Sequence, residues 1–183
     1  MNLHSTTIPL LLVIAASALM GACGFSSEPS LSEKLQKNEQ IAELQEESPF
    51  ELVLPDYLPE DTSLIRTRFY EPPIGGNYRA FMVFKIDDHS GLRITQHQHS
   101  TTMKGATSIY IDDKVDGEFI FYEFEATEAT HKAVLIFDVQ DATGIYDENL
   151  VKTVTLELNS KEFTTKEEMK IVLIKIASSM IPD

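Results

Sequence analysis

The chain has 183 residues, of which 43% are hydrophobic, and it carries a formal net charge of −14 at pH 7. This length is sufficient for one domain with a hydrophobic core, and the single cysteine excludes an intramolecular disulfide. A strongly acidic chain repels phosphate backbones and anionic headgroups, so a nucleic-acid partner is not expected.

Residues 1–22 are predicted to be a signal peptide. Residues 8–22 are almost all apolar, and no Asp, Glu, Lys or Arg precedes Glu28. Such a run spans about 22 Å as a helix, less than the roughly 30 Å of a hydrocarbon core, which disfavours a transmembrane helix. Its end, Met20-Gly21-Ala22-Cys23, resembles the signal of bacterial lipoproteins, in which small residues precede the modified cysteine. The alternatives are a secreted protein cleaved nearby and a cysteine buried in a core helix.

The resemblance implies that Cys23 receives fatty acyl chains such as palmitate and becomes the N-terminus after cleavage. One acyl chain binds a membrane only marginally, whereas two anchor a protein stably. The expected location is therefore the extracytoplasmic face of a bacterial cell membrane.

Residues 23–49 are predicted to be a lipidated N-terminus and a stalk. Residues 24–30 have the composition of a linker, and Ser30 followed by Glu33 forms a capping box that starts a helix. The apolar stripe along this helix is thin and consists of Leu31, Leu35, Ala42 and Leu44. So short a helix is marginal in water on its own, and we expect the segment to hold the body away from the membrane.

From Phe50 onward the sequence changes to short runs of β-forming residues, which begin the folded domain of residues 50–183. Seven strands are predicted, at residues 64–70, 78–86, 92–99, 107–111, 119–125, 133–139 and 151–158. Turn-forming sequences separate them at 72–77, 87–91 and 112–117. Short connections join antiparallel neighbours, which predicts a meander.

The last predicted element is a helix that covers the sheet. Thr164 or Thr165 can serve as its N-cap, with Glu167 or Glu168 three residues later. Apolar residues then recur at helical spacing, namely Met169, Val172, Leu173, Ile176 and Met180. The predicted fold class is α+β, a curved antiparallel sheet with a C-terminal helix packed on one face.

Two short motifs resemble an extracytoplasmic family classed as domain of unknown function 4367. Residues 55–61, Pro-Asp-Tyr-Leu-Pro-Glu-Asp, are similar to the motif that opens the family's domain, and residues 163–180 are similar to the helix that closes it. Asp61, where the family prefers glycine, and the lack of tryptophan depart from its pattern. The resemblance implies a distant similarity to lipoprotein-carrier folds, in which a half-open sheet and a helix enclose an apolar groove.

The same resemblance implies a site for an apolar ligand or a docked protein in that groove. The candidate lining residues are Met82, Phe84, Met169, Val172, Leu173, Ile176 and Met180. An ordinary core is the favoured interpretation of these residues, because one face of the helix must be buried in any case.

His97 and His99 are the candidates for a metal site. Both fall on one face of the predicted strand, about 7 Å apart, which suits two ligands of one ion. A hairpin that pairs Ile86 with Leu92 would place Arg79 opposite His99, a poor neighbour for a cation. Polar side chains on a solvated sheet face are therefore the favoured interpretation.

A calcium loop is matched only in part by residues 112–123. Asp112, Asp116, Gly117 and Glu123 occupy the first, fifth, sixth and twelfth positions of an EF-hand loop, but Lys114 occupies the third, where an oxygen ligand is required. A hairpin turn at Asp116-Gly117 explains the pattern more simply.

These observations predict a membrane-anchored lipoprotein that acts as a non-enzymatic binding or docking module and needs no cofactor. The sequence contains no nucleophile elbow, phosphate-binding glycine loop or zinc-protease motif. The expected partners are the membrane, through Cys23, and a protein or apolar ligand. The alternatives are a divalent-metal-binding module and, after it, a secreted hydrolase.

Overall fold

The computed structural model describes residues 29–73, 76–111, 115–123, 131–139, 151, 153–163 and 165–181. The helices in this part of the chain are α1 (Leu31–Gln36), α2 (Glu39–Glu47) and α3 (Lys166–Ser178). The strands are β1 (Ser63–Tyr70), β2 (Arg79–Lys85), β3 (Ser90–His97), β4 (Thr107–Tyr110), β5 (Asp116–Glu123), β6 (His131–Asp138) and β7 (Thr153–Ser160).

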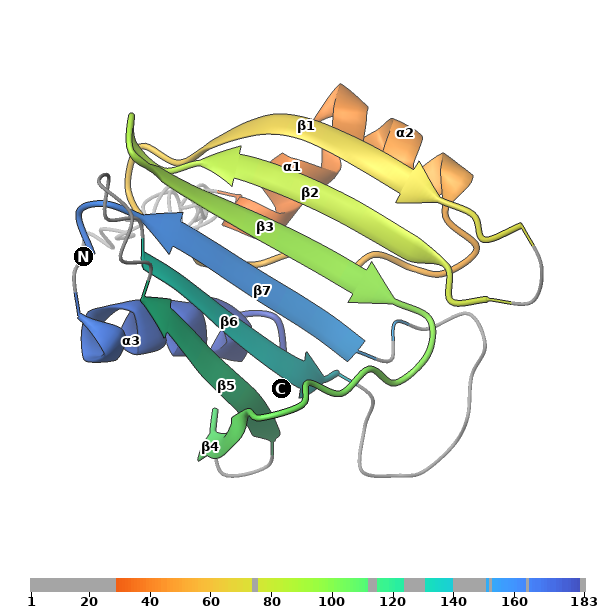
Figure 1. Ribbon diagram of the computed structural model, residues 1–183. Coiled ribbons are helices and arrows are strands. Elements are labelled where there is room, and N and C mark those ends of the chain that lie inside the picture. Colours follow the sequence, from red (N-terminus) through yellow and green to blue (C-terminus); the bar gives the residue numbers. More distant parts are fainter. Residues whose placement is uncertain are drawn as a thin grey trace, which may run out of the picture.

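The seven strands form one open, antiparallel sheet in the order β1-β2-β3-β7-β6-β5-β4 (Figure 1). Consecutive strands pair within β1 to β3 and within β4 to β7. However, β3 does not pair with β4: the chain crosses to the far edge of the sheet after β3, and β7 returns to lie beside β3. The α+β fold class is therefore confirmed, and the predicted meander consists of two meanders joined at the centre of the sheet.

All three helices lie on the same face of the sheet, as Figure 1 shows. Helix α2 packs against β1, and α3 packs against β6 and β7. The sheet side chains directed to this covered face are apolar and buried, because alternate residues of a strand point to the same side. They include Ala80, Met82, Phe84, Leu92, Ile94, Ala133, Leu135, Phe137, Val154, Leu156 and Leu158.

Side-chain caps start each helix where the sequence places a cap. Ser30 and Glu33 form the predicted capping box of α1, and Thr165 and Glu168 form that of α3. Asn38 caps α2 by accepting a hydrogen bond from the backbone N–H of Gln40. Helix α1 ends after only six residues, and Asn38 caps the start of α2, so the chain changes direction between the two helices.

The predicted stalk is wrong for residues 31–47. Leu35, Ile41 and Leu44 belong to the hydrophobic core, and Leu44 is only 2% exposed. The Thr67 hydroxyl of β1 also donates a hydrogen bond to the carbonyl of Gln40 in α2. A single straight helix would spread these leucines and isoleucine around its surface, but the break at Asn38 lets two short helices turn them all toward the sheet.

The segment between α2 and β1 also crosses the covered face. Its Phe50 and Leu52 side chains are buried, and Val53 pairs with the side-chain amide of Gln96 on β3. Farther along, the backbone N–H of Tyr57 donates to the hydroxyl of Ser179 at the end of α3. The helices and this segment together close the apolar face of the sheet.

Candidate anion-binding site

All four arginines of the chain lie on three neighbouring strands, and their side chains are exposed. Arg66 and Arg68 are on β1, Arg79 is on β2 and Arg93 is on β3. Arg79 and Arg93 alternate with buried residues of their strands, and Arg66 and Arg68 alternate with half-buried residues of β1, which places all four on the face opposite the helices. We call this face the open face.

Three of the arginines surround a small apolar area of the open face. The strand register places Arg66, Val83 and Arg93 in one row across β1, β2 and β3. Because neighbouring strands are about 4.8 Å apart, the Cα atoms of Arg66 and Arg93 are separated by roughly 10 Å. Arg68 lies opposite Phe81 in the adjacent row. The guanidinium groups thus stand around a floor formed by Val83 and Phe81.

These residues line a half-open pocket of about 410 Å³. Its lining consists of Arg66, Thr67, Arg68, Tyr70, Phe81, Val83 and Arg93. The Phe81 and Val83 side chains are half-buried, and Tyr70 is exposed. Within the described residues, neither Arg66 nor Arg68 forms an ion pair with a carboxylate, and no acidic side chain lines this pocket. The pocket therefore combines uncompensated positive charge with an apolar floor.

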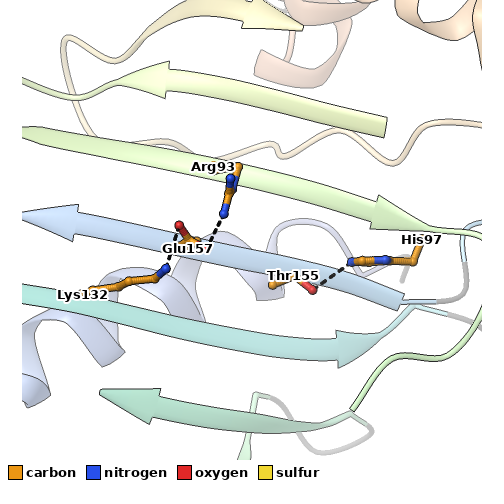
Figure 2. A network of polar contacts seen from close by, with 5 residues as sticks. All are labelled: Arg93, His97, Lys132, Thr155 and Glu157. Atoms are coloured by element: carbon orange, nitrogen blue, oxygen red, sulfur yellow. Dashed lines mark hydrogen bonds and ion pairs between the residues drawn. The ribbon is translucent and has the colours of Figure 1, made fainter. Parts of the chain in front are cut away.

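Arg93 is held in place by an ion-pair network on the open face (Figure 2). Its guanidinium donates to Glu157 Oε2 at 2.6 Å, and Lys132 Nζ lies 3.0 Å from Glu157 Oε1. Burial tends to raise the pKa of Glu157, but the hydrogen bonds and charges of Arg93 and Lys132 outweigh it and lower the pKa. One carboxylate thus serves two cations, which leaves this cluster with a net positive charge.

Arg79 and His97 lie opposite each other at one end of the open face. The Arg79 guanidinium is 5.9 Å from the centre of the Tyr70 ring, within range of a cation–π contact. His97 is only 6% exposed, and its Nε2 is 3.1 Å from the Thr155 hydroxyl (Figure 2). Burial and then the charge of Arg79 lower the pKa of His97 to about 4. The imidazole is therefore neutral at pH 7 and adds no charge to the face.

The arginines of the protein are unevenly distributed. The net charge of −14 predicts repulsion of anions if the acidic groups are spread evenly. Instead, the register of β1, β2 and β3 gathers every arginine of the chain on one half of one sheet face. A local positive site on an acidic protein can still attract an anion, because charges beyond about 8 to 10 Å are largely screened at physiological salt.

The predicted apolar groove does not open to solvent at the residues proposed for it. Met82, Phe84, Met169, Leu173, Ile176 and Met180 are each at most 2% exposed and belong to the core, and Val172 is half-buried against it. These residues therefore form part of an ordinary core, which was the favoured interpretation of the sequence.

The two candidate metal ligands are not on one strand face as predicted. Strand β3 ends at His97, and His99 is an exposed residue whose backbone N–H donates to the Asn77 side chain. The register is also two residues from the predicted one, because Leu92 pairs with Phe84 and Arg79 therefore faces His97. Among the described residues, no group of three or more His, Cys, Asp or Glu could hold a metal ion.

The partial calcium-loop match has a different explanation from the predicted hairpin turn. Asp116 and Gly117 begin β5, where they pair with Tyr110 and Ile109 of β4. Asp112 and Lys114 lie outside the described residues, as do Cys23 and the predicted signal peptide of residues 1–22. In the part of the chain that the structure covers, no helix is long and apolar enough to cross a membrane.

The arginine cluster was not predicted from the sequence, although two signals for it were present. Arg66 and Arg68 are two residues apart in a predicted strand, which places them on the same face. A correct register for the hairpin between β2 and β3 would then have brought Arg93 into the neighbouring row. The net charge of the whole chain carries no information about either signal.

Comparisons with family models, curated proteins and solved structures found no match to this chain.

Proposed function

We propose that this protein is a lipid-anchored extracytoplasmic binding module, and that the open face of its sheet binds an anionic ligand. One observation carries the proposal: in a chain of net charge −14, all four arginines lie on one face of three adjacent strands, and three of them line a pocket with an apolar floor. The choice of the open face is supported by burial of the opposite face, because the helices cover the side chains there.

The chemistry of the pocket favours binding over catalysis. Arginine stays protonated at all physiological pH values and offers a planar set of N–H donors, which suits recognition of carboxylates and phosphates. It is poorly suited to accept or release a proton during a reaction. We therefore propose a non-enzymatic role.

The anchoring part of the proposal rests on Cys23 and can be tested in cells. A bacterial host that expresses the chain is grown with radiolabelled palmitate, and the protein is isolated with and without the Cys23→Ala substitution. We expect label and a shortened chain for the natural sequence, and an unlabelled, uncleaved precursor for the variant. Equal labelling of both would contradict lipidation at Cys23.

The binding part of the proposal can be tested by ligand-induced stabilisation. A ligand that binds only the folded state raises the melting temperature in a concentration-dependent way. The full chain in nonionic detergent is melted with benzoate, phenyl phosphate, zinc or calcium. We expect stabilisation by an organic anion, with a loss of that effect in the Arg66→Gln/Arg68→Gln variant.

A matched control is Arg79→Gln, which removes one positive charge from the same face but outside the pocket lining. It should keep most of the stabilisation. If no anion stabilises the protein, or if Arg79→Gln removes the effect as fully as the double variant, the pocket is not the binding site. Stabilisation by zinc alone would favour the metal-binding alternative.

A further inference from the structure

We infer that the pocket between β1, β2 and β3 binds the phosphate group of an organic phosphate, with the apolar part of that ligand resting on Phe81 and Val83. The inference deepens the proposed function, because it rests on the open face as an anion-binding surface and names the class of anion.

The charge of the pocket favours a doubly charged group over a carboxylate. Arg66 and Arg68 lack an ion-pair partner within the described residues. Arg93 shares Glu157 with Lys132, so its charge is only partly compensated. A phosphate monoester, which carries close to two negative charges at pH 7, matches this excess better than a single carboxylate.

The placement of the arginines also suits a phosphate. Arg66 and Arg93 face each other across Val83, and Arg68 adds a third side chain in the adjacent row. Arginine N–H groups bind phosphate oxygens at about 2.8 Å, often two at a time. Arginines on either side of a small residue can therefore bind different oxygens of one tetrahedral group.

The ion pair with Glu157 prepares Arg93 for this role. It fixes the guanidinium group through one of its nitrogens, Nη2, at 2.6 Å from Glu157 Oε2. The remaining N–H groups stay available to a ligand, since an arginine has five of them. A side chain that is already ordered loses less conformational entropy when it binds.

The floor of the pocket accounts for the organic part of the ligand. Val83 and Phe81 are half-buried and present apolar surface between the guanidinium groups, and Tyr70 lies at the margin. The volume of about 410 Å³ is many times the roughly 30 Å³ share of one water molecule, so a phosphate does not fill it. An aromatic ring or a short acyl segment can occupy the remaining space.

The same chemistry is offered by a soluble phosphate monoester and by the monoester headgroup of phosphatidic acid. Both sources present a phosphate next to an apolar group. The experiment below separates them by using a soluble probe in one arm and a bilayer in the other.

The four arginines make the test specific. Arginine labelled with ¹⁵N gives at most four Nε–Hε signals in the NMR spectrum of this chain, and single Arg→Lys variants assign them. The full chain in nonionic detergent micelles is titrated with phenyl phosphate, inorganic phosphate and benzoate. We expect phenyl phosphate to shift the signals of Arg66, Arg68 and Arg93 more than that of Arg79.

The affinities should follow the two parts of the proposed ligand. Phenyl phosphate should bind at least tenfold more tightly than inorganic phosphate, because only the former contacts the apolar floor, and more tightly than benzoate. The Arg66→Gln/Arg68→Gln variant should weaken binding of phenyl phosphate at least tenfold, and Arg79→Gln should change it less than threefold.

A second arm uses bicelles of phosphatidylcholine with and without phosphatidic acid. Shifts of the three pocket arginines that require phosphatidic acid would assign the ligand to a lipid headgroup, whereas shifts with phenyl phosphate alone would assign it to a soluble molecule. If benzoate binds as tightly as phenyl phosphate at the same arginines, the phosphate inference fails and anion binding survives. If no anion shifts these signals selectively, both proposals fail.

Discussion

Replacement of Leu44 by alanine should destabilise the protein, although the residue lies in a segment that the sequence predicts to be a stalk. Leu44 is 2% exposed, and Ile41 and Leu35 are buried in the same core. If α1 and α2 extended away from the body, the Leu44 side chain would be in water in both the folded and the unfolded state. Its removal would then cost almost nothing.

The expected cost follows from the burial of this side chain. Leucine to alanine removes three buried carbon atoms, each worth about 0.8 kcal/mol of transfer free energy, or about 2.4 kcal/mol together. The cavity left behind adds to this loss, and such substitutions in protein cores cost about 2 to 5 kcal/mol. We therefore expect Leu44→Ala to lower the free energy of unfolding by about 3 kcal/mol.

Urea denaturation followed by circular dichroism measures this change. With a typical slope of about 2 kcal/mol per molar urea, the midpoint should fall by roughly 1.5 M. Glu43→Ala is a matched control, because Glu43 is the preceding residue of α2 and is exposed, and it should change stability by less than about 0.5 kcal/mol. A Leu44→Ala midpoint indistinguishable from that of Glu43→Ala would refute the packing of α2 on the sheet.

The buried polar residues His97 and Gln96 give two further predictions about stability. Burial and the charge of Arg79 lower the pKa of His97 from 6.5 to about 4, so the unfolded state binds more protons between these values. When unfolding is measured at pH values from 7 to 4, the free energy of unfolding should therefore fall by about 3 kcal/mol more for the natural protein than for His97→Gln. Parallel curves of this free energy against pH for the two proteins would contradict the prediction. Gln96 is 0% exposed and bonds both the N–H and the carbonyl of Val53. Gln96→Leu should cost about 2 to 4 kcal/mol by leaving both groups unpaired, whereas a thermal melt unchanged from the natural protein would show that they find other partners.

Local patterns in the sequence predicted the elements of the fold well. Residues at alternate positions, such as Met82 and Phe84, identify a strand with one buried face, because the side-chain period of a strand is two. The capping boxes of Ser30 with Glu33 and of Thr165 with Glu168 identify helix starts, because they depend only on residues three apart.

Errors arose where the outcome depended on distant residues. Nothing within residues 31–47 indicates the sheet that buries Leu44, and a thin apolar stripe is consistent with either a free or a docked helix. The pairing of β3 with β7 joins strands far apart in the chain and is not encoded in the turn between neighbours. Likewise, a hairpin register two residues from the predicted one changed the partner of Arg79 from His99 to His97.

The sequence by itself determined where strands and helices form, which residues of each are apolar, and that the chain is acidic. Only the tertiary structure decided that α1 and α2 join the core and that Arg66, Arg68 and Arg93 stand around one pocket. The physical reason is that periodicity and capping act over a few residues. Charge concentration and burial depend on which strands are neighbours, and that is settled by the packing of the whole sheet.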